Sequence, residues 1–188
     1  MMDDTQPSRP PANPASFAWH TLRYGGLAGL IGGGWMMAEY ALGLQTEHAD
    51  IGRWTALGLM VIPIATVVLG ITSWRNVALG GRIRFAEAFG LALAIGLVFS
   101  VTMGALAWLH AGVIAPDLVE NQIQHRAAVE AQLPGADPAA TARTAEEHLK
   151  LATPFLWARF VFSRMLVQSL LVGLIAAVTV PKKRPGLE

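Results

Sequence analysis

The sequence predicts an all-α protein, a four-helix transmembrane bundle with an extracytoplasmic helical hairpin between spans three and four. Of its 188 residues 53% are hydrophobic and only 14% are charged, whereas charged residues make up about 25% of a typical soluble domain. The run from Ala88 to Leu109 carries no formal charge and is long enough to cross a bilayer, which takes roughly 20 apolar residues in a helix. A polar insert, residues 116–152, separates this run from the last apolar segment.

Residues 1–21 are predicted to be a disordered cytoplasmic tail that precedes a membrane domain of residues 22–183. Four prolines stand among polar residues in the first part of this tail, at Pro7, Pro10, Pro11 and Pro14. Such a segment buries too little apolar surface to offset the entropy lost on folding.

Four apolar segments are expected to be the spans, at residues 22–44, 54–74, 85–110 and 155–181. The first is rich in glycine, is apolar apart from Glu39, and lacks a small-x-small cleavage site, which favours a retained span over a signal peptide. The second contains Pro63, where the missing N–H should kink the helix. The fourth begins at either Phe155 or Val161, because two arginines interrupt its apolar run.

The polar insert has the pattern of two helices joined by a turn. Pro116 is placed to start the first helix, which meets no breaker before Pro134. Asp137 followed by Pro138 supplies an N-cap acceptor and then the residue best tolerated at the first helical position. The first arm would be about 27 Å long, so the hairpin is expected to project well beyond the membrane surface.

The distribution of Lys and Arg predicts the orientation. One side of the spans would carry Arg9, Arg23, Arg75, Arg82, Arg84, Lys182, Lys183 and Arg184. The other side would carry Arg53, Arg126, Arg143 and Lys150, in or near a hairpin that is net acidic. The positive-inside rule then places both termini in the cytoplasm and the hairpin outside, for a multi-pass protein of the bacterial inner membrane.

Small residues recur at helical spacing, which lets helix backbones approach closely in lipid. The predicted helix-packing positions are Gly25, Gly29, Gly33, Gly96, Ser100, Gly104, Ser169 and Gly173. Packing within one bundle is favoured over a dedicated dimer face, for which the glycine-rich first span is the best candidate.

Three ionisable residues lie inside the predicted spans: Glu39, Arg159 and Arg164. Burying an unpaired charge costs at least about 2.5 kcal/mol, so each is expected to find a partner or water. Glu39 and Arg159 have similar expected depths. Glu39 is a candidate for an intramembrane ion pair with either Arg159 or Arg164, and a structural pair or snorkelling toward the interface is favoured over an ion or substrate site.

Motifs for catalysis, metal binding and nucleic-acid binding are lacking. The chain has no cysteine, and it shows no Gly-rich phosphate loop, nucleophile elbow or paired-carboxylate motif. Of the histidines on the predicted outer side, His48, His110, His125 and His148, none has metal-ligand spacing, so they are expected to be solvated. No enzymatic activity, catalytic residue, metal, cofactor or nucleic-acid partner is expected.

The segment LGGRIRFAEAFGLALAIG (Leu79 to Gly96), the acidic APDLVENQIQ (Ala115 to Gln124) and the terminal pair Lys182-Lys183 resemble a known family. It is the bacterial domain-of-unknown-function 4199 family of small membrane proteins, and the resemblance covers about residues 22–183. It implies the four-span architecture and transfers no catalytic residue. The hairpin here is Ala-rich and less charged than the resemblance implies.

The function expected from these features is a non-enzymatic structural or partner-binding component of the membrane. Its partners would be the lipid bilayer and, through the outer hairpin, a second copy or another membrane protein. The alternative is a small transporter or channel. That alternative is disfavoured because the middle of the spans carries no acid or histidine.

Overall fold

The computed structural model describes residues 14–45 and 48–180, which form helices and no strand. The helices are α1 (Pro14–Ala41), α2 (Ala49–Val77), α3 (Phe85–Leu109), α4 (Leu118–Glu130), α5 (Pro138–Lys150) and α6 (Pro154–Thr179), with a π-helical turn at His110–Ile114 directly after α3. The all-α class predicted from the sequence is confirmed.

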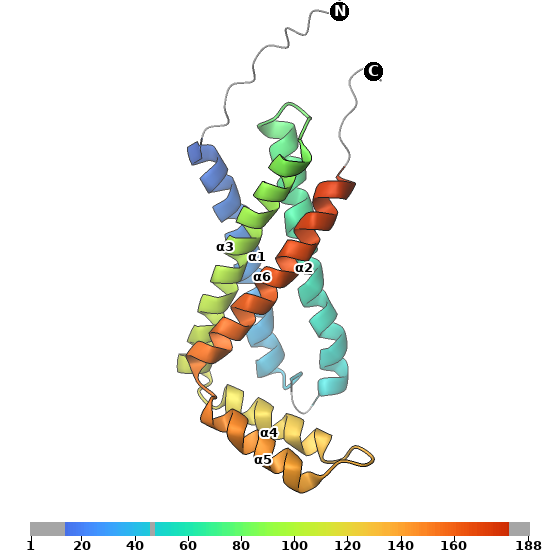
Figure 1. The fold of residues 1–188 in the computed structure, drawn as a ribbon. Helices are drawn as coiled ribbons and strands as arrows, with labels where there is room; N and C mark the ends of the chain where they lie inside the picture. The colour runs from blue at the N-terminus through green and yellow to red at the C-terminus, as the bar shows by residue number, and fades with distance from the viewer. Residues whose placement is uncertain (1–13, 46–47, 181–188) are drawn as a thin grey trace, which may run out of the picture.

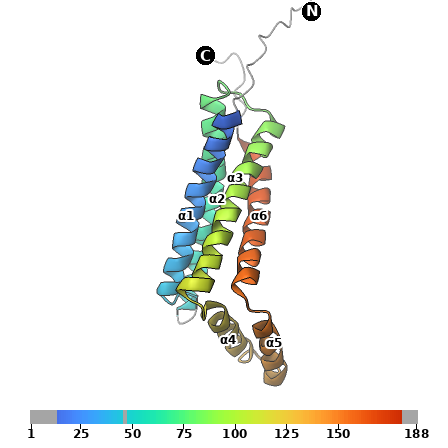
Figure 2. The ribbon, with the colours of Figure 1, turned by 90° about the vertical axis from the view of Figure 1, so that its left-hand side faces the viewer.

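Four long helices, α1, α2, α3 and α6, lie side by side and are called the bundle below (Figures 1 and 2). Helix α3 is central, because the two most extensive helix–helix interfaces in the structure are those that α3 makes with α6 and with α1. Helix α1 begins and α6 ends at the same end of the bundle, and α4 and α5 lie at the opposite end, the hairpin end (Figure 1).

Within the part of the chain that the structure describes, three helical segments are long and apolar enough to cross a membrane: Leu57–Val77, Phe85–Ile114 and Pro154–Thr179. They correspond to the second, third and fourth expected spans. The first expected span lies in α1, which does not reach the same mean hydropathy. Its glycines are close to neutral in hydropathy, and Arg23 and Glu39 lower the mean further.

Several helix boundaries differ from those expected. Helix α1 begins at Pro14, so part of the segment predicted to be disordered is helical, and proline is well tolerated there because the first turn needs no N–H donor. Helix α6 begins at Pro154, and the Thr153 hydroxyl accepts a hydrogen bond from the Leu156 N–H at 3.2 Å. This cap extends the helix ahead of both expected starts. The rest of the predicted tail, 1–13, and the chain after residue 180 lie outside the described residues.

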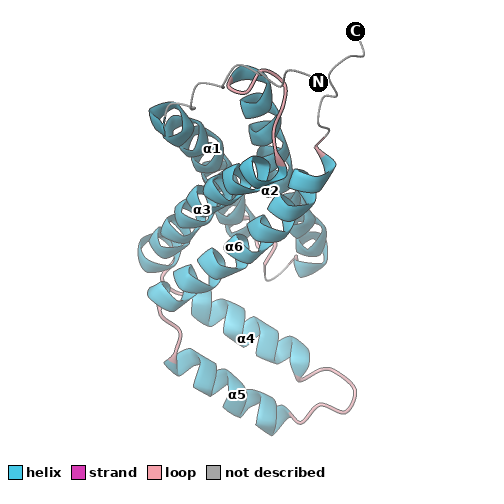
Figure 3. Cartoon of the chain, turned by 45° about the horizontal axis from the view of Figure 1, so that its top comes forward, coloured by secondary structure: helices cyan, strands magenta, loops and turns pink. Residues whose placement is uncertain are grey.

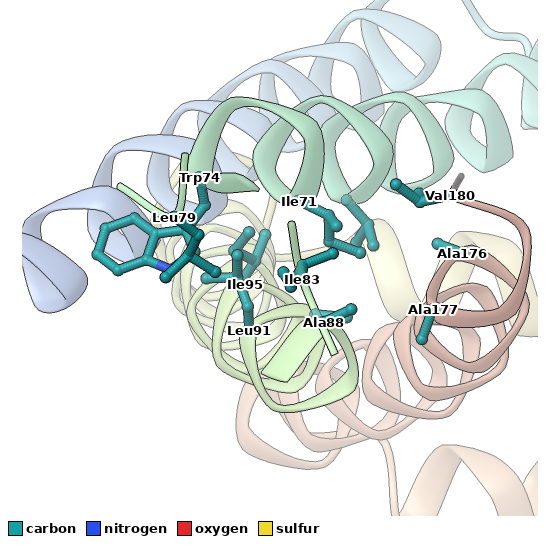
Figure 4. Packing of buried hydrophobic residues seen from close by; sticks show 12 residues of the cluster. Ile71, Trp74, Leu79, Ile83, Ala88, Leu91, Ile95, Ala176, Ala177 and Val180 are labelled. Atoms are coloured by element: carbon teal, nitrogen blue, oxygen red, sulfur yellow. The ribbon is translucent and has the colours of Figure 1, made fainter. Parts of the chain in front are cut away.

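The bundle has two apolar layers. The first lies toward the end opposite the hairpin (Figure 4) and comprises Val67, Ile71, Trp74, Leu79, Ile83, Ala88, Leu91, Ala92, Ile95, Ala176, Ala177 and Val180. The second lies nearer the hairpin and comprises Ala28, Met36, Phe99, Met103, Ala107, Val161 and Met165. Pro63 is buried between helices, within α2.

Helices α4 and α5 form the antiparallel hairpin that the sequence predicts, lying across the hairpin end of the bundle (Figure 3). Helix α4 is only 13 residues long, about 20 Å, and a side-chain hydrogen bond from Gln122 to Gln45 holds it against the α1–α2 connection. Leu118 is buried with Ala111 and Ala115. The first arm is therefore shorter than the length of about 27 Å expected, and these few contacts join its first half to the hairpin end of the bundle.

Candidate functional site

The hairpin end of the bundle holds a buried carboxyl group. Glu39 lies in the last turn of α1 and is 7% exposed. Its Oε1 accepts hydrogen bonds from the indole N–H of Trp35 at 2.9 Å and from the hydroxyl of Thr55 at 2.7 Å. Trp35 is one turn earlier on α1, whereas Thr55 belongs to α2. The carboxyl group therefore fastens the end of α1 to the start of α2.

The two arginines expected near Glu39 are elsewhere. Arg159 and Arg164 are exposed on α6, and α1 and α6 pack mainly on different parts of α3. Within the described residues neither arginine forms an ion pair with Glu39. Similar depth in a membrane does not specify the side of a bundle. The structure thus replaces the expected ionic partner with two neutral hydrogen-bond donors.

The glycines of α1 lie against α3. A Cβ atom added to Gly25 would come within 2.6 Å of the Ile95 carbonyl oxygen and 2.7 Å of the Val98 Cβ. At Gly29 it would meet Thr102, and at Gly33 it would meet Leu106, in both cases closer than ordinary contact. These positions have no space for a side chain, so α1 and α3 approach each other along this row.

The small residues of α3 and α6 lie against each other. A Cβ atom on Gly96 would come within 2.5 Å of the Ser169 Cβ, and one on Gly173 within 2.9 Å of the Ala92 Cβ. Gly104 faces Phe162. The buried hydroxyl of Ser100 donates to the Gly96 carbonyl at 2.7 Å, so it requires no partner from another helix. All eight predicted packing positions lie inside the bundle.

His110 begins the π-helical turn and is only 1% exposed. The ring of Tyr40 meets it edge to face, with centroids 5.1 Å apart. The N–H of Ala115 donates to the His110 carbonyl at 2.8 Å, closing the wider turn. In the described structure its Nδ1 and the indole nitrogen of Trp157 are buried without a hydrogen-bond partner. The expectation that His110 is solvated is therefore wrong, because the apolar helix continues past it.

The other histidines predicted to lie on the outer side differ from His110. His48 and His148 are exposed and His125 is half-buried. No group of three or more metal-ligating side chains gathers anywhere in the described ranges. The hairpin histidines thus lie in ordinary surface surroundings.

A cleft of about 200 Å³ lies where the hairpin meets the bundle. Its wall consists of Ala111, Pro116, Val119, Glu120, Leu149, Ala152 and Pro154. Glu120 is the only ionisable residue among them, and its Oε1 accepts a hydrogen bond from the Gln124 amide at 2.9 Å. The cleft can hold an apolar group beside one carboxylate, and its wall contains no hydroxyl, thiol or imidazole that would act as a nucleophile.

Sequence reasoning missed the two contacts that organise this end of the bundle. The spacing of Trp35 and Glu39, four residues apart on one helix, is a detectable signal for their hydrogen bond. No comparable signal links Thr55 to Glu39 or Tyr40 to His110. Both of those contacts depend on how separate helices pack.

Comparison with known proteins supports the resemblance seen in the sequence. A protein-family model described as "Protein of unknown function (DUF4199)" matches residues 23–182. Neither a curated protein nor a solved structure matches the chain. The match covers the hairpin and the bundle except for the first turns of α1, and the chain belongs to the DUF4199 family of proteins of unknown function.

Proposed function

We propose that this protein is a non-enzymatic, four-span component of the bacterial inner membrane that binds a partner protein through its outer hairpin. Both termini would lie in the cytoplasm. The observation that carries the partner role is the hairpin itself. It is held against the bundle by few contacts, and of its two helices only Leu118 is buried, so most of its surface remains available.

Tryptophan positions support α1 as a fourth span. Trp19 and Trp35 on α1 are separated by about 24 Å and Trp54 and Trp74 on α2 by about 30 Å, at 1.5 Å per residue. The pairs lie at matching levels, since Trp35 packs near Gly58 and Trp74 near the start of α1. Both separations fit a hydrocarbon core of about 30 Å with tryptophan at its two interfaces.

The charge distribution supports the orientation. Arg75, Arg82 and Arg84 lie at the end of the bundle where α1 begins. The hairpin carries more acidic than basic residues. The acidic residues are Asp117, Glu120, Glu130, Asp137, Glu146 and Glu147, and the basic residues are Arg126, Arg143 and Lys150. Basic residues favour the cytoplasmic side.

The interior of the bundle supports a partner-binding component over a small transporter or channel. A transport path would be lined by Glu39, Thr66, Ser100 and Gln168. Ser100 is instead bonded to its own helix, and the space between Pro63, Phe99 and Ser169 has no room for water. In the described residues, this closed region in the middle of the bundle favours the partner role over a transport path.

Cysteine labelling tests the topology, because the chain has no native cysteine. Asp137→Cys in the hairpin turn should react with a membrane-impermeant maleimide in intact cells. Val77→Cys, 86% exposed at the other end, should react only after lysis and serves as the matched control. Labelling of Asp137→Cys only after lysis would reject the orientation.

The partner role is tested on the apolar side chains near the hairpin tip. Val129 and Leu133 are 49% and 57% exposed, so replacing both with serine should leave the fold intact. Co-purification of a specific membrane protein should be lost in this variant and kept in Thr144→Ser, a hairpin control. If the hairpin variants and the native chain recover the same proteins, the partner role is wrong.

A further inference from the structure

Four polar side chains interrupt the apolar run in the first two thirds of α6. Arg159, Ser163 and Arg164 are exposed and Gln168 is half-buried. In the described structure none of the four forms a hydrogen bond or an ion pair. Arg164 and Gln168 are four residues apart and therefore share one face of the helix.

The placement proposed above puts this polar surface inside the bilayer. Trp157 lies near the level of Trp35, since Gly33 on α1 packs on Leu106 and Phe162 on α6 packs on Gly104, two residues apart on α3. Measured along the helix from Trp157, Arg164 is about 10 Å deeper and Gln168 about 16 Å deeper. Gln168 then lies near the middle of a hydrocarbon core of about 30 Å.

Lipid headgroups can satisfy only part of this surface. Side chains on α6 lean toward its N-terminus, which is at the hairpin end, so Arg159 and Arg164 can extend toward outer phosphates. The Gln168 amide is too short to cover its distance from the interface. A hydrogen-bonding group that reaches it must come from another helix.

A second copy of this chain also fits poorly. A two-fold contact through this face would bring the Arg164 side chains of both copies together in a low-dielectric layer, where like charges repel strongly. A carboxylate from a different protein would attract them instead. Helices α2 and α6 draw apart toward the hairpin end (Figure 1), and Arg164 and Val167 on this part of α6 are exposed.

We propose that the α6 face formed by Arg164 and Gln168 is the docking surface for a transmembrane helix of another protein. That helix carries a carboxylate opposite Arg164 and, about one turn deeper, a side chain that hydrogen-bonds Gln168. The inference rests on the proposed bilayer placement and assigns the partner a chemical class, an acidic transmembrane segment.

A designed probe tests the proposal. The full chain, carrying Lys150→Cys for attachment of a donor fluorophore, is reconstituted into phosphatidylcholine vesicles with an acceptor-labelled single-span Leu/Ala helix. One version of this helix has Glu about 10 Å below its outer end and Asn one turn deeper, and the control version has Leu at both positions. Energy transfer should show about five- to thirtyfold tighter association of the acidic helix, as expected for an interhelical polar pair.

Variants locate the effect on α6. Arg164→Leu and Gln168→Leu should each remove most of the preference for the acidic helix, and Arg164→Lys should keep part of it. Arg126→Leu, on the hairpin, should leave the preference unchanged. Equal association of the acidic helix and the control helix overturns the proposal. Energy transfer between two copies of this chain that is lost in Gln168→Leu also overturns it, because it would identify this face as a homo-oligomer contact. An effect of Arg164→Leu that appears only with anionic lipid would identify a headgroup site and also overturns it.

A depth measurement separates this inference from the proposed placement. A fluorophore on Val167→Cys, which is 57% exposed beside Gln168, should be quenched by lipids that carry a quencher deep in the acyl chain. Absence of this quenching rejects the placement. Deep quenching without preference for the acidic helix rejects the docking surface alone.

Discussion

The bundle and the hairpin are stabilised by different kinds of interaction. In the bundle, the backbone of one helix lies directly against the backbone or a Cβ atom of the next helix at positions such as Gly25 and Gly96, so no side chain fits there. In the hairpin, the main stabilising features are local. Asp137 caps α5 by accepting from the Ala139 N–H at 2.9 Å, and Gly135 turns the chain with a positive φ of 83°. The bundle thus depends on contacts between distant segments, and the hairpin depends largely on its own sequence.

This difference predicts that equally small substitutions will have unequal effects. A single methyl group in a helix interface must displace a neighbouring helix, because dense packing leaves no space for it. A substitution of similar size at the Asp137 cap of the hairpin affects only the first turn of α5. Three experiments test that contrast, beginning with the largest expected effect.

Gly25→Ala should lower the free energy of unfolding by about 1–3 kcal/mol, because the new Cβ would meet the fixed carbonyl of Ile95. Gly26→Ala is the matched control. Nothing lies within 4 Å of a Cβ at Gly26, so alanine should leave stability unchanged or raise it by up to about 1 kcal/mol through helix propensity. Unfolding followed in detergent measures both. Equal stability of the two variants would show that the α1–α3 contact is not tight.

The buried carboxyl group should show coupling to α2 and not to α6. Glu39→Gln and Thr55→Val should each reduce stability by about 1–2 kcal/mol, because each weakens the hydrogen bond between α1 and α2. A double-mutant cycle should find that the two losses are not additive. The cycle of Glu39→Gln with Arg159→Gln should be additive within error. Coupling in this second cycle would instead support the ion pair expected from the sequence.

Asp137→Ala should have the smallest effect on global unfolding. Losing an N-cap costs a helix about 0.5–2 kcal/mol, and α5 contributes no buried residue. Hydrogen exchange should therefore speed up in the first turn of α5 while the unfolding midpoint of the bundle stays the same. Thr144→Ala, later on the same helix, controls for helix propensity. A fall in the bundle midpoint would show that the hairpin stabilises the bundle more than its contacts suggest.

The local signals in the sequence were sufficient for the all-α class and for much of the hairpin. Proline at the first turn and an acidic N-cap predicted α5 to its first residue. Apolar length predicted α2, α3 and α6, but it could not place the start of α6, because the Thr153 cap adds helix beyond the apolar run. Helix α1 differs because its glycines make contacts without raising its hydropathy.

The candidate site was harder to predict because its contacts join separate helices. Depth alone suggested Glu39 and Arg159 as partners, whereas the rotation of α1 and α6 about α3 determines which side chains meet. The π-helical turn shifts the helix register just where His110 becomes buried. No periodicity in one segment encodes either feature.

The most extensive helix contact joins α3 to α6, with the hairpin between them in the chain. During synthesis and insertion, as the proposed topology requires, the small-residue face of α3 is left uncovered until the hairpin has been translocated and α6 has followed it. Bundle assembly then depends on the order of biogenesis. A chain stalled after α5 would retain α1 against α3 but would present Gly96 and Gly104 to lipid, a surface that membrane quality-control proteases and insertion chaperones could recognise as incomplete.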